Sequence, residues 1–247
     1  MSHAEIREGD CLARLREIPD ASIDAVVMDP PYCSGAISEA GRSGAKSQGV
    51  STTSSTHDAI EGSWFKGDNM GTAGISYLLR AVGFESCRIL KPSGSVLCFM
   101  DWRQVPNLVP AIESSGLRYQ NLVVWDKGSA AMGFGFRAAH ELCAHFTNGE
   151  PAFHSFNGSN VLRHKRLPSA GRDHFAQKPV ELLCDLLRVV CPPEGRVLDP
   201  FAGSGSTLVA AASLGMSAIG FERDRGYVEV ARARLSAGAD LFAGGAS

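Results

Sequence analysis

A glycine-rich turn between a strand and a helix is the segment of this chain best suited to bind a ligand. The apolar run Arg196-Val197-Leu198 leads into Asp199-Pro200-Phe201-Ala202-Gly203-Ser204-Gly205-Ser206-Thr207, and Ser206-Thr207 can cap the helical pattern that continues to Ala212. The glycines allow a tight turn and close approach of a ligand. The next strand, Ser217 to Phe221, ends on Glu222, about 20 residues further on, where nucleotide folds place a carboxylate on ribose hydroxyls. This series predicts a nucleoside site; an ordinary strand–helix turn is the alternative.

A second strand near the start of the chain also ends on an acid. Ile23 to Met28 is a buried apolar run that leads directly into Asp29-Pro30-Pro31-Tyr32. Asp-Pro-Pro-Tyr near the start and Asp-Pro-Phe-x-Gly-x-Gly near the end together resemble the amino-group DNA methyltransferases that use S-adenosylmethionine. The motif order, catalytic first and cofactor last, resembles the circularly permuted arrangement of their β class. The resemblance covers nearly the whole chain.

The resemblance implies a catalytic role for the residues of the first motif. Methyl transfer to an exocyclic amine is an in-line displacement by a poor nucleophile, whose lone pair is delocalised into the ring. Asp29 and the Pro30 carbonyl can accept the two amino hydrogens, and the stiff Pro30-Pro31 pair fixes their direction. Tyr32 can stack on a base flipped from the duplex. We therefore expect Asp29, Pro30, Pro31 and Tyr32 to be catalytic, without a metal ion or a covalent nucleophile.

The same resemblance implies a cofactor site built from several segments. Gly9-Asp10 follows a first strand, Ala4 to Glu8, so Asp10 is a candidate for contact with the cofactor's adenine, although helix capping explains it equally well. Lys178 precedes Pro179 at a helix start, where free amides can hold an anion. The full set of cofactor candidates is Asp10, Asp29, His174, Phe175, Lys178, Asp199, Phe201, Ala202, Gly203, Ser204, Gly205, Ser206, Thr207 and Glu222.

The region from Gly149 to Asp173 has little periodicity and carries the local basic residues of the chain. These are Arg163, Lys165, Arg166 and Arg172, beside His164. With a net charge of -2 for the whole chain, double-stranded DNA must meet a local basic patch, and we expect these residues to contact phosphates. A solvated charged loop is the alternative. The resemblance implies that this region recognises the target, as in β-class enzymes, and its small size predicts a short recognition sequence or help from a second subunit in a homodimer.

Two loops next to the motifs are further candidates. Residues 33–57 are rich in Ser, Gly and Thr, which predicts a mobile loop, either a lid that orders on DNA or cofactor, or a passive insertion. In the glycine-rich link from Gly128 to Arg137, Phe134 and Phe136 can stack a base, although packing under the loop is the default.

Composition fits one soluble α/β domain over 1–247, although a small appended lobe is possible, and the resemblance implies that this domain is a methyltransferase catalytic domain. The chain has 247 residues, 44% of them hydrophobic, with no apolar run of membrane-spanning length and no signal-peptide pattern, so we expect a cytoplasmic protein. The 7 cysteines contain no Cys-x-x-Cys pair, which favours buried free thiols over metal ligands or disulfides.

Further strands are expected over 95–100, 119–125 and 141–146, the last a hairpin partner at the sheet edge, and helices over 11–18, 75–90, 105–114, 180–190 and 227–235. With the resemblance, this implies a Rossmann-like methyltransferase fold: a mostly parallel sheet of seven strands with helices on both faces and one antiparallel strand. Ligands in such sheets bind at the carboxyl ends of the strands, where Asp10, Asp29, Asp199 and Glu222 fall.

Other functions remain open at this point. An NAD-dependent dehydrogenase would use a similar glycine turn and Glu222 but leaves Asp-Pro-Pro-Tyr unexplained, and a non-catalytic DNA-binding protein needs no cofactor site. Among methyltransferases, the acceptor is expected to be N6 of adenine, because Asp at the first motif position is more usual in adenine enzymes and Ser in cytosine enzymes. N4 of cytosine, RNA and protein glutamine are the alternatives.

Overall fold

The computed structural model describes residues 3–31, 71–130, 135–155, 158–166 and 177–243. Five of the residues singled out above lie outside these ranges: Tyr32, Phe134, Arg172, His174 and Phe175. The predicted loop over 33–57 also lies outside them, as do residues 156–157 and 167–173 of the predicted DNA-contacting region.

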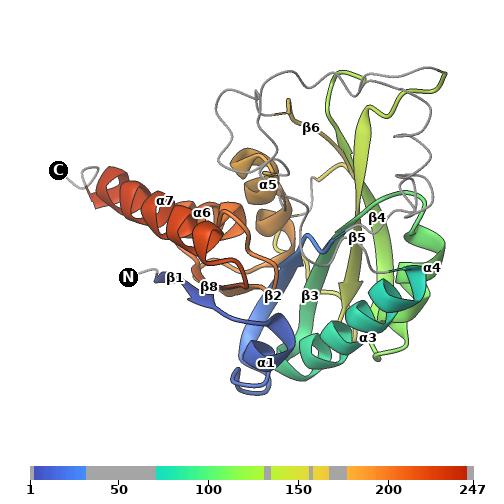
Figure 1. Cartoon of the computed structure of the whole chain (residues 1–247), viewed down its shortest axis with the longest axis horizontal. Coiled ribbons are helices and arrows are strands. Elements are labelled where there is room, and N and C mark those ends of the chain that lie inside the picture. Colours follow the sequence, from blue (N-terminus) through green and yellow to red (C-terminus); the bar gives the residue numbers. More distant parts are fainter. Residues whose placement is uncertain (1–2, 32–70, 131–134, 156–157, 167–176, 244–247) are drawn as a thin grey trace, which may run out of the picture.

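One mixed sheet organises the described part of the chain (Figure 1). Its strands are β1 (Ala4–Glu8), β2 (Ile23–Met28), β3 (Leu90–Met100), β4 (Arg118–Asp126), β5 (His140–Thr147), β6 (Val161–Arg163), β7 (Arg196–Asp199) and β8 (Ser217–Glu222). The order is β1-β8-β7-β2-β3-β5-β4-β6. All neighbours are parallel except β3 and β5, and β5 and β4. The predicted mostly parallel α/β fold with one antiparallel strand is confirmed.

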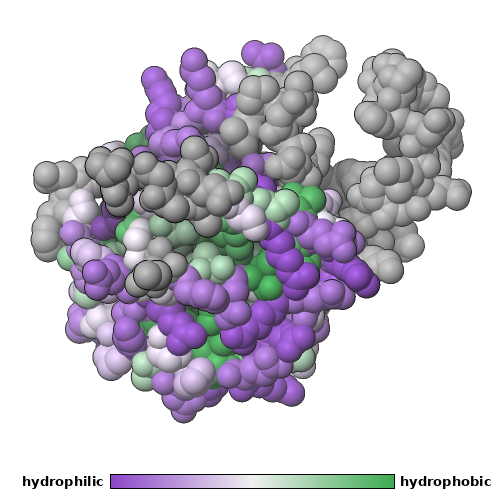
Figure 2. Space-filling model, turned by 90° about the vertical axis from the view of Figure 1, so that its left-hand side faces the viewer, coloured by the Kyte–Doolittle hydropathy of each residue, from purple (hydrophilic) through white to green (hydrophobic). Residues whose placement is uncertain are grey.

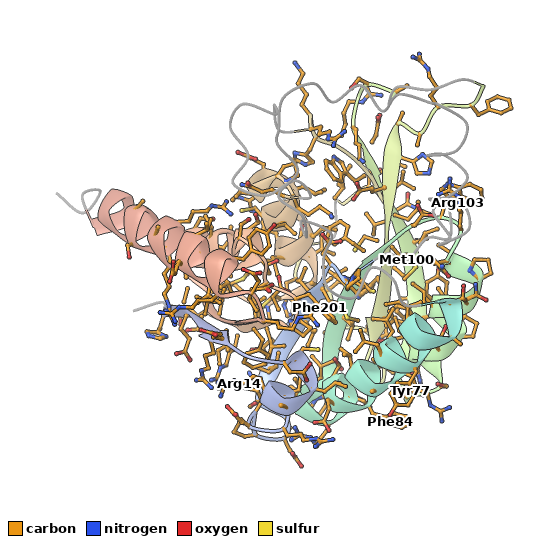
Figure 3. All side chains as sticks on the ribbon, in the orientation of Figure 1. Arg14, Tyr77, Phe84, Met100, Arg103 and Phe201 are labelled. Carbon is orange, nitrogen blue, oxygen red and sulfur yellow. The ribbon has the colours of Figure 1, made fainter. Side chains whose placement is uncertain are left out.

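Helices cover both faces of the sheet, as expected (Figure 1). One face carries α1 (Cys11–Leu15), α3 (Thr72–Ile89) and α4 (Val105–Glu113), and the other carries α5 (Val180–Val190), α6 (Ser206–Ser213) and α7 (Arg225–Ala243). On the first face, Tyr77 and Phe84 lie on the outer side of α3, away from the sheet (Figure 3).

Alternation along the central strands supplies both layers of the core. Val26 and Met28 pack into the cluster under α1 and α3, whereas Ala25 and Val27 pack into the cluster under α5 and α6. Successive side chains of a strand point to opposite faces, so a strand covered on both sides must be apolar throughout. This requirement explains why the continuous apolar run before Asp29 marks the centre of the sheet.

Three sequence-based expectations need correction. The sheet has eight strands, not seven, because β6 forms inside the region predicted as a loop and pairs with β4. The strand over 140–147 is not at the edge, since β5 lies between β3 and β4. Gly205, at φ 79°, is the N-cap of α6 and no side chain caps that helix, so Ser206 and Thr207 do not have the predicted capping role.

The surface and the thiols are unremarkable in the described ranges. On the side where α7 lies, hydrophilic side chains predominate, with small apolar areas between them (Figure 2). Within these ranges no helix combines the length and apolarity needed to cross a bilayer.

The described cysteines are free thiols and, apart from the half-buried Cys87, are buried, as predicted. No group of three or more His, Cys, Asp or Glu residues in the same ranges is placed to hold a metal ion.

Candidate active site

Four acidic residues that end or follow parallel strands meet at one edge of the sheet. Strands β1, β8, β7 and β2 are consecutive and parallel, so their carboxyl ends share an edge. These strands lead to Asp10, Glu222, Asp199 and Asp29, respectively. The amide of Gly9 donates to the Glu222 carbonyl at 2.8 Å and fixes β1 against β8 at this edge. Ligands of open α/β sheets bind at such an edge.

The glycine turn after β7 is held in shape by Glu222. Gly203 and Gly205 have φ values of 50° and 79°, which favour glycine. The Glu222 carboxylate accepts hydrogen bonds from the Gly203 amide at 3.0 Å and the Asp224 amide at 2.7 Å. A Cβ atom on Gly205 would lie 2.9 Å from the Ala231 Cβ of α7. The second glycine is therefore required by helix packing as well as by its backbone angle.

An arginine that sequence reasoning missed holds the two serines of this turn. Arg234 of α7 donates to the Ser204 carbonyl at 2.6 Å, to the Ser204 hydroxyl at 3.0 Å and to the Ser206 hydroxyl at 3.2 Å. Both serines are buried. Their side chains, predicted as cofactor contacts, take part in anchoring the turn to α7. Arg234 lies in a helix with an ordinary amphipathic pattern, so only the fold reveals this contact.

Asp199 is the most deeply buried of the four acids, at 4% exposure. Burial raises the pKa of its carboxyl to about 7, and the nearby negative charges of Asp29 and Glu222 add to the effect. Hydrogen bonds from Thr207 and from the Phe201 amide, the latter at 2.9 Å, act in the opposite direction. Phe201 itself packs against the apolar cluster beneath α1 and α3 (Figure 3). A cation bound here would stabilise the ionised form of Asp199.

The catalytic candidate Asp29 is paired with Lys178, just before α5. The Lys178 ammonium donates to Asp29 Oδ2, and it also lies 3.3 Å from Glu141 Oε2 and 5.0 Å from the centre of the Phe99 ring. Lys178 is only 7% exposed. Burial alone lowers the pKa of this ammonium, but the two carboxylates more than offset that effect and raise it. A buried lysine that is charged at neutral pH thus lies beside the predicted catalytic motif.

Glu141, at the start of β5, is a second site residue that sequence reasoning missed. One of its oxygens accepts from Lys127 at 2.6 Å, and the other faces Lys178. Burial alone raises the pKa of the Glu141 carboxyl, but the two ammonium groups bring it below its ordinary value. The available signal was the pair of charged residues, Lys127 and Glu141, that flank the two apolar strands at the end where the chain passes from β4 to β5.

Asp10 caps helix α1. This is the second of the two roles predicted for it, the first being a contact with the cofactor's adenine. Its carboxylate accepts from the Leu12 amide at 3.0 Å and the Ala13 amide at 3.2 Å at the start of α1. This capping is compatible with an additional ligand contact, since a carboxylate accepts several hydrogen bonds.

The basic residues lie on and just after β6, beyond β4 at the edge of the sheet. Arg163 Nε donates to Asp126 Oδ2 at 2.8 Å. The Gly128 amide and Arg163 hold the pKa of the Asp126 carboxyl below its ordinary value. Lys165 and Arg166 are exposed. His164 lies 2.9 Å from Asp185 of α5, and its carbonyl accepts from the Trp125 indole at 2.8 Å, which joins β6 to the body of the protein.

Comparison with known proteins shows the family to which this chain belongs. The model of a DNA methylase family, the N6/N4 methyltransferases, matches residues 23–233. The chain belongs to this family. It is 27% identical to the type II methyltransferase M.HinfI of Haemophilus influenzae over 257 residues, which cover 93% of this chain and 67% of M.HinfI.

Solved structures show the same fold. The crystal structure of the M1.HpyAVI–SAM complex matches with a TM-score of 0.69 and 18% identity, covering 94% of this chain and 98% of that one. PvuII DNA methyltransferase, described as cytosine-N4-specific, matches with a TM-score of 0.73 and 17% identity, covering 98% and 92% of the two chains. Likenesses at these identities establish the Rossmann-like methyltransferase fold and do not select an acceptor base.

Family membership confirms the resemblance to amino-group DNA methyltransferases. The cofactor of this family of DNA methylases is S-adenosylmethionine. The dehydrogenase alternative and the alternative of a non-catalytic DNA-binding protein are thereby set aside. The four acids and the buried lysine described above lie where the fold binds its ligands.

Proposed function

We propose that this DNA methylase transfers a methyl group from S-adenosylmethionine to the N6 amino group of adenine in duplex DNA. The observation that carries the proposal is the position of Asp29 at the end of β2. Its negative charge is near enough to raise the pKa of Asp199, and its carboxylate pairs with the Lys178 ammonium. One carboxylate can thus face both the cofactor's methyl group and the target amine. Asp29 and the Pro30 carbonyl accept the two amino hydrogens and bias the nitrogen toward a tetrahedral geometry.

The chemistry of the described residues fits the cofactor. Glu222, which accepts a hydrogen bond from the Gly203 amide, can also accept from the ribose hydroxyls of the cofactor. Lys178 is a buried cation that can pair with the carboxylate of the cofactor's methionine part. Asp199 and Asp29 supply negative charge near the sulfonium. The cofactor supplies an electrophilic methyl group. The chain's own residues orient the target amine in line with it, so positioning carries most of the rate.

The DNA duplex is proposed to lie across β6. Arg163, Lys165 and Arg166 suit phosphate contacts, which fix the register of the protein on the duplex without reading the sequence. Tyr32 keeps its predicted role of stacking on the flipped base. A cytoplasmic protein that acts alone or as a homodimer fits this role.

The acceptor atom is tested by identifying the labelled base. Duplex DNA is incubated with S-adenosylmethionine labelled in its methyl group, digested to nucleosides and separated. We expect label in N6-methyl-2′-deoxyadenosine, because the motif begins with Asp29 rather than with serine. Label in N4-methylcytosine alone would show the same fold and cofactor acting on the other base. Parallel reactions with RNA and with protein test the remaining acceptors.

The role of Asp29 is tested with Asp29→Asn, which preserves its shape. Transfer should fall by at least about a hundredfold, while the dissociation constant for S-adenosylmethionine, measured by calorimetry, should change by only a few-fold. Methylation of DNA near the wild-type rate in this variant would show that the reaction does not need a charged acceptor at position 29, since the amide oxygen of the asparagine can still accept a hydrogen bond from the target amine.

A further inference from the structure

Glu141 belongs to a network of ion pairs with alternating charges, in which Lys178 alone separates it from Asp29. The order is Asp29, Lys178, Glu141, Lys127, with Lys178 bridging the two acids and Glu141 bridging the two lysines. The four residues come from β2, the segment before α5, β5 and the end of β4. They are remote in sequence and meet only through the packing of β5 into the sheet beside β3.

The consequence of this arrangement is that two carboxylates share one buried ammonium. A buried one-to-one ion pair in a low-dielectric environment holds its partners strongly. A second anion 3.3 Å from the Lys178 nitrogen pulls the ammonium toward itself and offsets part of its positive potential at Asp29. Asp29 must accept an N–H group from the target amine during the proposed reaction, and the same carboxylate already accepts from Lys178.

We propose that Glu141 is a positioning residue of the methylation reaction: by sharing the Lys178 ammonium, it weakens the hold of that ammonium on Asp29 and so lets the Asp29 carboxylate accept the target amine. The inference deepens the function proposed above and rests on it. Glu141 acts through Lys178 and need not touch the substrate.

The charged and titratable groups around Asp29 set the sign of the expected effect. Lys178 favours the ionised carboxylate and the negative charge of Glu141 disfavours it, while Asp199, whose pKa is about 7, adds negative charge near Asp29 only above that pH. The Cys98 and Cys143 thiols of the adjacent strands β3 and β5 also interact with Asp29. Burial raises the pKa of both thiols far above neutrality, so they remain neutral and contribute no charge.

The test substitutes Glu141→Gln, which keeps the shape of the side chain and removes its charge. The pKa of Asp29 should then fall, because a nearby negative charge has been removed and the Lys178 ammonium interacts with Asp29 without competition from Glu141. The acid limb of the pH–rate profile should move down by about half a pH unit. The kcat should fall by about tenfold, with less than about a twofold change in the KM for S-adenosylmethionine. Glu141→Asp should recover part of the kcat and leave the acid limb between its positions in Glu141→Gln and in the wild type.

A second readout does not depend on activity. Carboxyl ¹³C NMR of protein labelled at aspartate follows the protonation of Asp29 directly, with Asp29→Asn providing the assignment. Glu141→Gln should shift this titration to lower pH, and Lys178→Met should shift it to higher pH. The matched control is Glu150→Gln, an exposed acid paired with Arg118 at the opposite edge of the sheet, which should shift neither.

The outcomes separate the two proposals. An unchanged Asp29 titration in folded Glu141→Gln, or a loss of kcat with an unmoved acid limb, would overturn the positioning role and leave Glu141 a structural residue. If Glu141→Gln does not fold, the shorter Glu141→Asp must move the titration in the same direction by a smaller amount. A wild-type protein that methylates no DNA would instead overturn the proposed function, whatever the NMR titration shows.

Discussion

Lys178 donates a hydrogen bond to Asp29 across 149 residues of sequence. The contact joins the segment before α5 to the end of β2, and it places a buried cation against the first residue of the proposed catalytic motif. Both residues had been expected near the cofactor, but as separate contacts. Their pairing means that substitutions of either residue change the charge felt by the other.

The first prediction concerns the cost of removing this cation. Lys178→Met leaves the Asp29 and Glu141 carboxylates near each other without the ammonium between them, and should lower the free energy of unfolding by about 3 kcal/mol at pH 8. Acidification should recover part of the loss, because protonating one acid removes the repulsion. Urea unfolding at pH 8 and pH 5 measures both effects. Lys165→Met, at an exposed position, is the control, and an equal loss in both variants would contradict the argument.

The strand ends were predictable from the sequence because two simple rules act together. Continuous apolar runs such as Ile23–Met28 indicate buried parallel strands, and the carboxyl ends of parallel strands lie at one edge. The chain positions of Asp29, Asp199 and Glu222 therefore place these acids on the same edge without any knowledge of side-chain contacts.

Contacts made by long side chains were not predictable in this way. Arg234 reaches the glycine turn only because α7 packs against Gly205, and Glu141 meets Lys178 only because β5 inserts between β3 and β4. β6 has three residues, too few for a periodic pattern, so its strand character depends on pairing with β4. The missed features all arise from tertiary packing rather than from local sequence.

The second prediction follows from the raised pKa of Asp199. The carboxyl titrates at about 7 in the folded protein against an ordinary value of 3.8. Between these two values the unfolded chain has lost the proton and the folded protein retains it. The free energy of unfolding therefore falls as pH rises through this window, by up to about 4 kcal/mol from this group.

Asp199→Asn isolates that contribution because it cannot ionise. Urea unfolding at several pH values measures the free energy of unfolding of both proteins. Relative to Asp199→Asn, the value for the wild type should fall between pH 4 and pH 7 and stay constant above pH 7. Asp20→Asn, at an acid whose side chain is 75% exposed, should show no comparable trend. A difference that does not vary with pH would show that Asp199 ionises normally in the fold.

The third prediction tests the ribose role of Glu222. Glu222→Gln keeps an oxygen that can accept from the Gly203 amide, gives up the hydrogen bond from the Asp224 amide and removes the charge of the acceptor. The free energy of binding S-adenosylmethionine should weaken by about 1.5–3 kcal/mol, the range for a hydrogen bond to a charged group. Calorimetric titration measures the dissociation constant, with Glu229→Gln on the exposed side of α7 as the control. Wild-type affinity in a folded Glu222→Gln protein would rule out the ribose contact.

The last prediction concerns the basic residues at β6. Asp126 holds the Nε of Arg163, and a guanidinium has further donors on its terminal nitrogens that suit a phosphate. Each phosphate contact adds about 0.9 to the slope of log affinity against log salt. Arg163→Ala and Lys165→Ala should therefore each weaken duplex binding, similarly for all sequences, and each reduce the salt slope by about 1.

Fluorescence anisotropy of a labelled duplex, titrated at several salt concentrations, measures both quantities. Arg118→Ala is the matched control, since Arg118 is the exposed arginine that begins β4 at the opposite edge of the sheet, where it pairs with Glu150. An equal loss of affinity for Arg118→Ala would mean that bulk charge, and not the position of β6 beside the catalytic edge, attracts the DNA. An unchanged salt slope for both Arg163→Ala and Lys165→Ala would contradict the proposal that the duplex lies across β6.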